Sequence, residues 1–435
     1  MADFARSDSA AVQAQLDRLA RLAPGDDRLG LDRISRLLDR LGRPQDKLPP
    51  LFHVAGTNGK GSTCAFLRAI LDAAGHRVHM FTSPHLVRFN ERIRIEDKLI
   101  GDDELAQLLE EVLDASDGIE PSFFEVTTAV AFLAFARHPA DACIVEVGLG
   151  GRLDATNIIE APLVCGIAGL GVDHRQWLGK RLGDIAAEKA GIAKRGVPLV
   201  TQRYPPQAAQ RVQQAAETAG AHWFARGALW DVRIIRGDIH YRDRGGALAL
   251  PLPRLPGRYQ ADNAALAVAM LRQQERLDVS REAMAEGIAT ADWPARLQKL
   301  RAGPLSNALP ARSELWVDGG HNGAAARLVA DHIRGWTGDL PLVILFASLS
   351  SKDPASMLKP FRGLAAAVHT LPIPDHDHRQ PKELAALASE LGFAATDNKT
   401  LKQALGRIAQ PSRVLIFGSL YLAGEALKAN GEIPD

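Results

Sequence analysis

The chain has 435 residues, which is enough for two or three domains with substantial cores. Its 52 Lys and Arg residues nearly balance 51 Asp and Glu residues, so the net charge of +1 creates no overall field that would attract nucleic acid or anionic lipid. Hydrophobic residues make up 46% and charged residues 24%, which is typical of a globular protein and argues against extensive disorder.

Cysteine content and the apolar segments indicate the compartment. The chain has three widely spaced cysteines: Cys64, Cys143 and Cys165. Their odd number argues against a disulfide framework, and their spacing argues against a cysteine zinc site. The segment Met1–Ala11 lacks the apolar stretch of a secretory signal. The apolar windows Thr127–Ala136 and Leu342–Leu349 are much shorter than the roughly 20 residues of a membrane helix, so we expect buried core there and a cytoplasmic protein.

The first half of the chain alternates between helical and strand patterns. Helices are predicted over Ala10–Leu22 and Leu31–Leu41, where apolar residues recur at helical spacing. Short apolar runs bounded by Gly, Pro or polar residues then predict four strands: Leu51–Ala55, Arg77–Phe81, Ala142–Val147 and Leu163–Ala168. Helical patterns lie between most of them, which is typical of a mostly parallel α/β sheet.

The pattern changes twice in the second half. Short alternating segments between Leu229 and Leu250 predict antiparallel hairpins, which would form a small β appendage. A helix is predicted over Ala261–Arg272, and the polar stretch from Asp292 to Arg312 is interpreted as a domain linker. Four further strands are predicted after it: Glu314–Asp318, Leu342–Ala347, Ala366–Leu371 and Arg413–Phe417.

These patterns predict an α/β protein of two domains. Residues 1–295 would form a P-loop-containing, mostly parallel sheet domain that carries the β appendage and binds ATP. Residues 296–435 would form a smaller, Rossmann-like α/β domain.

The strongest local motif follows the first predicted strand and directly precedes a helix. It comprises seven residues: Gly56, Thr57, Asn58, Gly59, Lys60, Gly61 and Ser62. Glycines let the backbone wrap a phosphate with its N–H groups, the helix N-terminus adds positive potential, and Lys60 can reach the outer phosphates. The spacing differs from the standard G-x-x-x-x-G-K-S/T motif. The alternative is a glycine-rich turn without a ligand, but we predict a nucleotide site.

Three polar residues follow other predicted strands, where parallel sheets present ligand loops. Ser83 could ligate magnesium or cap a turn, and His174 could be a ligand, an outer-shell group or a hydrogen-bonded loop histidine. Glu146 ends a buried strand and needs a partner, which Mg²⁺ could supply because it prefers oxygen ligands. By itself, the helical pair Glu188-Lys189 is interpreted as a solvated face.

Together, these segments resemble the dihydrofolate synthase/folylpolyglutamate synthase family of the Mur ligase superfamily. The resemblance spans the chain and depends on the order and spacing of its motifs. The matching stretches are Leu29–Arg33, Gly56–Ser62, Thr82–Leu86, Phe123–Glu125, Glu146–Asn157, Asp173-His174, Glu188–Ile192, Leu255–Gln260 with Asn263, Trp293–Arg296, Asp318–Asn322 and Gly418–Tyr421.

The resemblance implies an ATP-dependent ligase. ATP would phosphorylate the carboxylate of a pteroate or folate, and the amine of L-glutamate would attack the resulting acyl phosphate, with ADP and phosphate as the other products. Phosphorylation turns a carboxylate oxygen into part of a competent leaving group, and Mg²⁺ and Lys60 would offset the negative charge. We expect both activities, on dihydropteroate and on reduced folates, in a monomer with no nucleic acid or membrane partner.

The family's site residues carry over by position. The magnesium ligands, for two Mg²⁺ sites, would be Ser83, Glu146, His174 and Lys189, and Lys189 would be the lysine that is carbamylated in the family. The nucleotide would also contact Asn263, Arg296 and Asp318, the last two from the second domain, so that catalysis would lie between the domains. The pterin or folate would lie along Ser122, Phe123, Phe124, Glu125, Leu153, Asp154 and Ala155. Lys60, Lys189 and His321 are the expected catalytic residues.

Some assignments leave alternatives open. Phe123 and Phe124 can stack on a flat heterocycle, but the sequence fits ordinary core residues equally well. Glutamate is expected near His321 and Ser419. The chain departs from the family at Gly323, where Pro is usual, and at Ala295, where Gly is usual.

Two other functions fit parts of the pattern. The first is a Mur-type enzyme that joins an amino acid to a UDP-muramyl precursor, but Phe123–Glu125 and Leu29–Arg33 favour folate. The second is a P-loop ATPase switch that controls a partner. A switch would not need the second α/β domain with Asp318.

Overall fold

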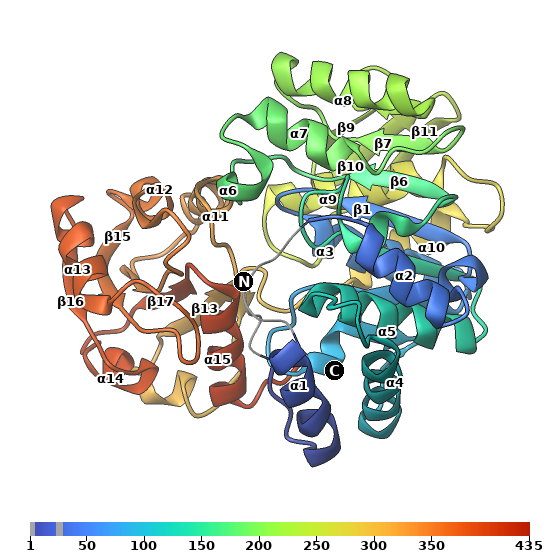
Figure 1. Ribbon diagram of the computed structural model, residues 1–435. Coiled ribbons are helices and arrows are strands. Elements are labelled where there is room, and N and C mark those ends of the chain that lie inside the picture. Colours follow the sequence, from blue (N-terminus) through green and yellow to red (C-terminus); the bar gives the residue numbers. More distant parts are fainter. Residues whose placement is uncertain (1–4, 23–28) are drawn as a thin grey trace. The chain divides into compact units, whose positions relative to one another are not determined.

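The computed structural model describes residues 5–22 and 29–435 (Figure 1). The chain forms two compact units, each with its own sheet. The first unit extends to Arg254 and includes Gln260–Asp292 and Asp435, whereas the second comprises Leu255–Tyr259 and Trp293–Pro434. Within the described residues, no helix is both long enough and apolar enough to cross a membrane.

An eight-stranded sheet is the centre of the first unit, in the order β4-β3-β2-β5-β1-β6-β7-β8. Its strands are β1 (Leu51–Ala55), β2 (Val78–Phe81), β3 (Ile93–Ile95), β4 (Lys98–Leu99), β5 (Ala142–Glu146), β6 (Val164–Ile167), β7 (Pro198–Thr201) and β8 (His222–Ala225). Six strands run parallel, and β3 and β4 extend one edge in antiparallel pairing. The predicted mostly parallel sheet is confirmed.

Helices pack around this sheet. They are α1 (Ala10–Leu22), α2 (Asp32–Arg40), α3 (Lys60–Ala73), α4 (Asp102–Ala115), α5 (Phe123–Arg137), α6 (Arg175–Leu178), α7 (Leu182–Ala190), α8 (Pro206–Ala219), α9 (Arg258–Leu271) and α10 (Arg281–Thr290). Helices α1, α2, α4 and α5 share one hydrophobic cluster with β2 and β5, whereas α7 and α8 share another with β6 and β7. The apolar window Thr127–Ala136 lies in α5 and is buried apart from its last residue, Ala136, as expected of a core helix.

A three-stranded antiparallel sheet forms the predicted β appendage, in the order β11-β10-β9. Its strands are β9 (Trp230–Ile235), β10 (Asp238–Asp243) and β11 (Gly246–Pro251). The guanidinium of Arg272, the residue after α9, donates two hydrogen bonds to Asp243, at 2.6 and 2.8 Å, and so ties β10 to the end of that helix.

The second unit has a six-stranded sheet in the order β12-β13-β17-β14-β15-β16. Its strands are β12 (Gln298–Lys299), β13 (Glu314–Asp318), β14 (Leu342–Phe346), β15 (Ala365–Thr370), β16 (Ala394–Asp397) and β17 (Arg413–Phe417). All pairs are parallel except β12 with β13. Its helices are α11 (Gly323–Ile333), α12 (Pro354–Leu358), α13 (Pro381–Glu390), α14 (Leu401–Gly406) and α15 (Leu420–Asn430).

Short 3₁₀ helices complete both units: η1 (Pro44–Lys47), η2 (Phe89–Arg92), η3 (Ala155–Ile158), η4 (Ser306–Ala308) and η5 (Lys359–Phe361). Six short strands were not predicted from the sequence: β3, β4, β7, β8, β12 and β16. β8 and β16 have four residues each, none of them fully buried, and such short segments give no period by which a strand is recognised.

Candidate active site

The glycine motif forms the turn between β1 and α3. Gly56 has φ +152° and Gly59 has φ +87°, and an added Cβ on Gly59 would lie 2.4 Å from Oδ1 of Asn263. Both positions therefore favour glycine. The N–H groups of Thr57 and Asn58 donate to the carbonyl of Gly169, at 2.8 and 3.1 Å. The turn is thereby fixed, and the first N–H groups of α3, which have no acceptor within the helix, are available to a phosphate.

Lys60 and Glu146 face each other at the carboxyl ends of β1 and β5. The Lys60 ammonium Nζ lies 3.6 Å from Glu146 Oε1, and both side chains are largely shielded from water. Glu146 Oε2 also accepts a hydrogen bond from the Ser83 N–H at 3.3 Å. The structure thus brings together Lys60, Ser83 and Glu146, which adjacent parallel strands β2, β5 and β1 deliver to one edge of the sheet.

Lys189 is a buried lysine on α7 and does not lie on the solvated face that its local sequence suggests. Burial and, to a smaller extent, the nearby charge of Lys60 lower the pKa of Lys189 to about 7, against the opposing effect of Asp173 and Asp154. A neutral amine is therefore well populated near neutral pH. Gly151 makes room for this arrangement, because an added Cβ would lie 2.7 to 3.0 Å from the backbone of Glu188 and Lys189.

His174 is the N-cap residue of α6 and has a left-handed backbone, with φ +48°. Its N–H donates to Asp173 Oδ1 at 2.8 Å, and its Nε2 lies 4.0 Å from Asp173 Oδ2. Asp173 therefore contacts His174 and also acts on Lys189 through its charge. Asp173 orients His174 and contributes negative charge to this edge of the sheet.

The donors around Glu146 suit magnesium. Within residues 5–22 and 29–435, no cluster of three or more His, Cys, Asp or Glu side chains forms a complete metal site. Mg²⁺ usually retains several waters and binds through one or two carboxylates and substrate phosphates. The buried Glu146 carboxylate and the adjacent Ser83 hydroxyl are oxygen donors of this kind, so the residues fit a metal that arrives with a nucleotide.

The expected pterin residues of α5 lie at its N-terminus. Ser122 and Glu125 form a capping box, with bonds of 2.6 and 3.2 Å, and Arg33 Nε donates to Glu125 at 3.0 Å. Phe123 and Phe124 are half-buried: Phe123 packs edge-on against Phe89, and Phe124 lies at a tilt to Phe81. Both aromatic rings thus belong partly to the core and retain some exposed surface.

The loop after β5 carries the other expected pterin residues. Asp154 is buried, which raises the pKa of its carboxyl, and it accepts hydrogen bonds from the N–H of Leu149 at 2.7 Å and of Thr156 at 3.0 Å. Leu153 and Ala155 flank it in the chain. The Thr156 hydroxyl donates to Asp154 at 2.5 Å and lies 2.8 Å from Nε2 of His53. The loop is therefore ordered by Asp154 itself.

In the second unit, Asp318 at the end of β13 organises the segment that carries Arg296. Its Oδ2 accepts from the N–H of Leu297 at 2.8 Å, and its Oδ1 accepts from the N–H of Gly320 at 2.7 Å. Burial raises the pKa of Asp318, and the positive charge of Arg296 opposes that rise. Ala295 has φ +55°, which explains why glycine is usual there.

Asn263 lies against the glycine turn in the first unit, as noted for Gly59, and its Nδ2 donates to Gln260 at 3.0 Å. In the second unit, His321 Nδ1 lies 3.1 Å from the carbonyl of Gly319, and Ser419 is the N-cap residue of α15. Gly323 is the first residue of α11, a position where proline fits a helix equally well.

Several residues around these sites were not expected from sequence. Arg92 is almost fully buried, stacks over the rings of Phe89 and Phe123, and donates from Nε to Nδ1 of His85 at 2.9 Å. His53 lies within β1 and is fully buried, which lowers its pKa to about 3. A lone arginine or histidine in a sequence gives no sign of burial, so only its position inside or beside a predicted strand could have drawn attention to it.

Known proteins resemble this chain over nearly its full length. No family model matches the chain. It is 33% identical to dihydrofolate synthase/folylpolyglutamate synthase of Bacillus subtilis, over 92% of this chain and 94% of that protein. It is 32% identical to dihydrofolate synthetase of Saccharomyces cerevisiae, over 92% of this chain and 97% of that protein.

Solved structures agree with this relationship. Escherichia coli FolC in complex with DHPP and ADP superposes with a TM-score of 0.86, at 30% identity over 97% of this chain and 98% of that one. A bifunctional folylpolyglutamate synthase/dihydrofolate synthase with Mn, AMPPNP and L-glutamate bound gives a TM-score of 0.85, at 30% identity over 98% and 99% of the two chains. The fold, the motif order and these similarities agree, and the chain belongs to the dihydrofolate synthase/folylpolyglutamate synthase family of ATP-dependent ligases.

Proposed function

We propose that the protein adds L-glutamate to dihydropteroate and to reduced folates, with ATP converted to ADP and phosphate. The observation that carries this proposal is the polar cluster at the end of the first sheet, where Lys60 faces Glu146 beside a helix N-terminus and near buried Lys189. Relatives that bind ADP, AMPPNP, Mn and L-glutamate support it. The two alternatives, a UDP-muramyl ligase and an ATPase switch, have no comparable support.

The residues of the glycine turn would bind the ATP phosphates. N–H groups at the start of α3 point toward bound anions in sites of this type, and the Lys60 ammonium would leave Glu146 to neutralise charge on the γ-phosphate. One carboxylate oxygen of the folate then attacks the γ-phosphorus, and the bond to ADP breaks. The glutamate amine attacks the acyl carbon, loses a proton, and displaces phosphate that carries the attacking oxygen.

Magnesium would be held by Ser83, Glu146, His174 and a carbamylated Lys189, at two sites. When bound, the metal would supply Lewis-acid stabilisation of the phosphate charge. Lys189 suits carbamylation because its amine is buried and lies close to the charges of Lys60, Asp154 and Asp173. Intact-protein mass, measured under non-acidic conditions after equilibration with bicarbonate, should show the mass of one added CO₂ in the wild type and none in Lys189→Arg. An unmodified wild-type mass would remove this role.

The remaining substrates have candidate residues in both units. The pterin would lie along Ser122–Glu125 and Leu153–Ala155, where Phe123 and Phe124 keep exposed ring surface. Asn263 would contribute to adenine binding, Arg296 and Asp318 to nucleotide binding from the second unit, and His321 and Ser419 to glutamate binding. We propose further that the chain is organised as domains 1–295 and 296–435, a boundary close to the division of the two units between Asp292 and Trp293, and that the enzyme acts as a cytoplasmic monomer.

Substrate dependence tests the proposal. Purified protein is given MgATP and, in turn, dihydropteroate, tetrahydrofolate or a UDP-muramyl substrate, each with and without L-glutamate, and ADP and amide product are measured. We expect ADP release coupled to amide formation with both pterin substrates and only with glutamate. Turnover confined to the muramyl compound, or ADP release that needs no acceptor, would contradict the proposed function.

A further inference from the structure

The segment that carries Arg296 has an unfavourable backbone conformation. We call Ala295, Arg296 and Leu297 the Arg296 turn. Ala295 has φ +55° and Leu297 has φ +46°, and both are fully buried. A left-handed backbone is unfavourable for residues with a Cβ, so it persists only where surrounding contacts determine it. Arg296, half-exposed between the two, depends on those contacts for its position.

One set of contacts comes from the end of β13. Asp318 accepts the N–H of Leu297, and the N–H of Gly319 donates to the carbonyl of Ala295 at 2.9 Å. These bonds hold the carbonyl of Ala295 and the N–H of Leu297. The N–H of Ala295 needs another partner.

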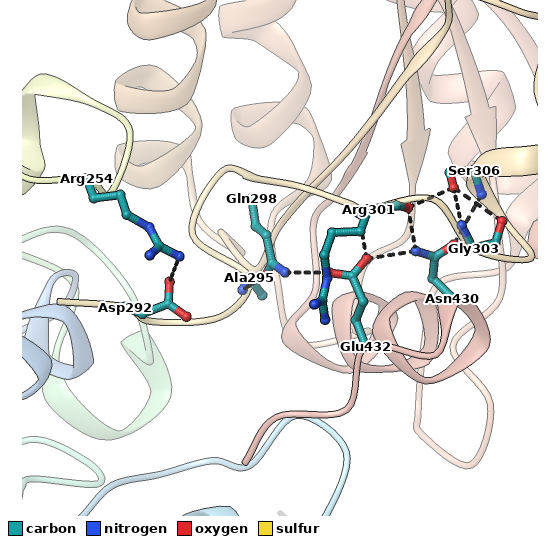
Figure 2. A network of polar contacts seen from close by, with 9 residues as sticks. All are labelled: Arg254, Asp292, Ala295, Gln298, Arg301, Gly303, Ser306, Asn430 and Glu432. Atoms are coloured by element: carbon teal, nitrogen blue, oxygen red, sulfur yellow. Dashed lines mark hydrogen bonds and ion pairs between the residues drawn. The ribbon is translucent and has the colours of Figure 1, made fainter. Parts of the chain in front are cut away.

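Gln298 and Glu432 supply that partner (Figure 2). The Ala295 N–H donates to Gln298 Oε1 at 2.9 Å, and Gln298 Nε2 donates to Glu432 Oε2 at 3.3 Å. Because a peptide N–H can only donate and a carboxylate can only accept, the amide of Gln298 has one possible orientation.

Glu432 is held in turn by groups beyond the turn. Its Oε1 accepts from the Arg301 N–H at 2.7 Å and from Asn430 Nδ2 at 2.8 Å, and its side chain is 8% exposed. The carboxylate therefore has a fixed position, and it fixes Gln298 against the Arg296 turn.

We propose that Gln298 and Glu432 are positioning residues of the reaction, which hold the Arg296 turn so that the Arg296 guanidinium is preorganised for the ATP phosphates. This inference rests on the proposed role of Arg296 in nucleotide binding. Preorganisation matters because an ordered guanidinium pays no ordering entropy when ATP binds, and small displacements of a binding group have large effects. Neither residue contacts substrate, so the effect should fall on the apparent affinity for ATP.

The test uses an isosteric variant and a reciprocal swap. Gln298→Glu keeps an acceptor for the Ala295 N–H but places a carboxylate against Glu432. We expect its KM for ATP to rise about tenfold, with KM for the pterin substrate and kcat at saturating ATP changed less than about twofold. The double variant Gln298→Glu/Glu432→Gln restores a donor facing an acceptor. The Arg301 guanidinium, whose Nε donates to Glu432 Oε2 at 3.3 Å, is 80% exposed and can turn to water in this variant, so KM for ATP should return to within about threefold of wild type.

Ser306→Ala is the matched control for a loss of stability alone. The Ser306 hydroxyl belongs to the same network but contacts Gly303 and Arg301, and it makes no bond to the Arg296 turn (Figure 2). We expect it to lower the melting temperature and leave KM for ATP unchanged.

Arg296→Ala separates this inference from the proposed function. A raised KM for ATP in Arg296→Ala together with a normal value in Gln298→Glu would overturn the positioning role and leave the nucleotide role of Arg296 intact. A normal value in Arg296→Ala would remove that nucleotide role and the positioning role with it. Failure of the reciprocal swap to restore KM would also contradict the inference.

Discussion

Two turns that we expect to bind ATP both contain residues with positive φ, but different residue types adopt it in each. The turn between β1 and α3 in the first unit has positive φ at Gly56 and Gly59, where no side chain opposes it. The Arg296 turn in the second unit has positive φ at alanine and leucine and is held by hydrogen bonds from Gln298, Asp318 and Gly319. Hydrogen bonds to distant residues hold both turns, but in the first turn glycine adopts the left-handed backbone without steric cost, whereas in the second the bonds must also offset an unfavourable φ at residues with a Cβ.

The largest effect should come from the first turn. Lys60→Ala removes the ammonium that lies 3.6 Å from Glu146 Oε1, and with it the charge that we expect to stabilise the γ-phosphate. We predict a loss of at least about 10³-fold in kcat, with a circular dichroism spectrum unchanged from wild type. Near-normal turnover would remove Lys60 from the mechanism.

Gly59→Ala tests whether the glycine turn depends on its residue type. The new Cβ would combine a φ of +87° with a 2.4 Å approach to Asn263. We predict that KM for ATP rises at least about tenfold and that the free energy of unfolding falls by about 1–3 kcal/mol.

Gly75→Ala is the matched control for that variant. Gly75 has a similar φ of +83°, but an added Cβ there meets no atom within 4 Å. It should lower stability by about 1–2 kcal/mol and leave KM for ATP unchanged. An equal rise of KM for ATP in Gly59→Ala and Gly75→Ala would show that the effect does not come from the geometry of the glycine turn.

The buried His53 in β1 should make the free energy of unfolding depend on pH. Its folded pKa of about 3 lies below the ordinary value of 6.5, so the unfolded state binds more protons between these values and stability falls as pH drops below 6.5. At pH 5.5 the loss should be about 1.4 kcal/mol. In His53→Gln, urea denaturation at pH 7.5 and 5.5 should show a pH-dependent loss smaller by that amount. An identical pH dependence in both proteins would contradict this account.

Ala295→Gly should have the smallest effect on stability and, unlike most substitutions to glycine, should increase it. Glycine at φ +55° relieves the left-handed backbone of the second turn, so we predict a gain of about 0.5–1 kcal/mol in the free energy of unfolding. Ala209→Gly, in the first part of α8, is the control and should lose about 1 kcal/mol. Destabilisation at both positions in urea titrations would show that the Arg296 turn is not strained.

The fold could be predicted in large part because its central strands are buried. The predicted limits of β1, β13 and β17 match the observed bounds, since these strands are apolar runs bounded by clear turn signals. The short edge strand β16 and the two-residue strand β12 could not be predicted, because partly exposed residues gave no distinct period.

In the candidate site, too, only features with a local sequence pattern could be predicted. Glycines, Lys60 and Glu146 could be recognised because their chemistry lies within short motifs next to strands. The burial of Lys189 could not be recognised, because its local helix pattern resembles a solvated face and the close packing of α7 against the loop at Gly151 joins segments far apart in the sequence. Gln298 and Glu432 are 134 positions apart, so no local pattern pairs them.

The most direct test of the central claim follows one oxygen atom. Dihydropteroate labelled with ¹⁸O in its carboxylate is incubated with enzyme, MgATP and L-glutamate, and the released phosphate is analysed by mass spectrometry. Ligation through an acyl phosphate predicts one ¹⁸O atom in each phosphate, in equal amount to the amide product. Amide formation with unlabelled phosphate, or phosphate release without amide, would contradict the account.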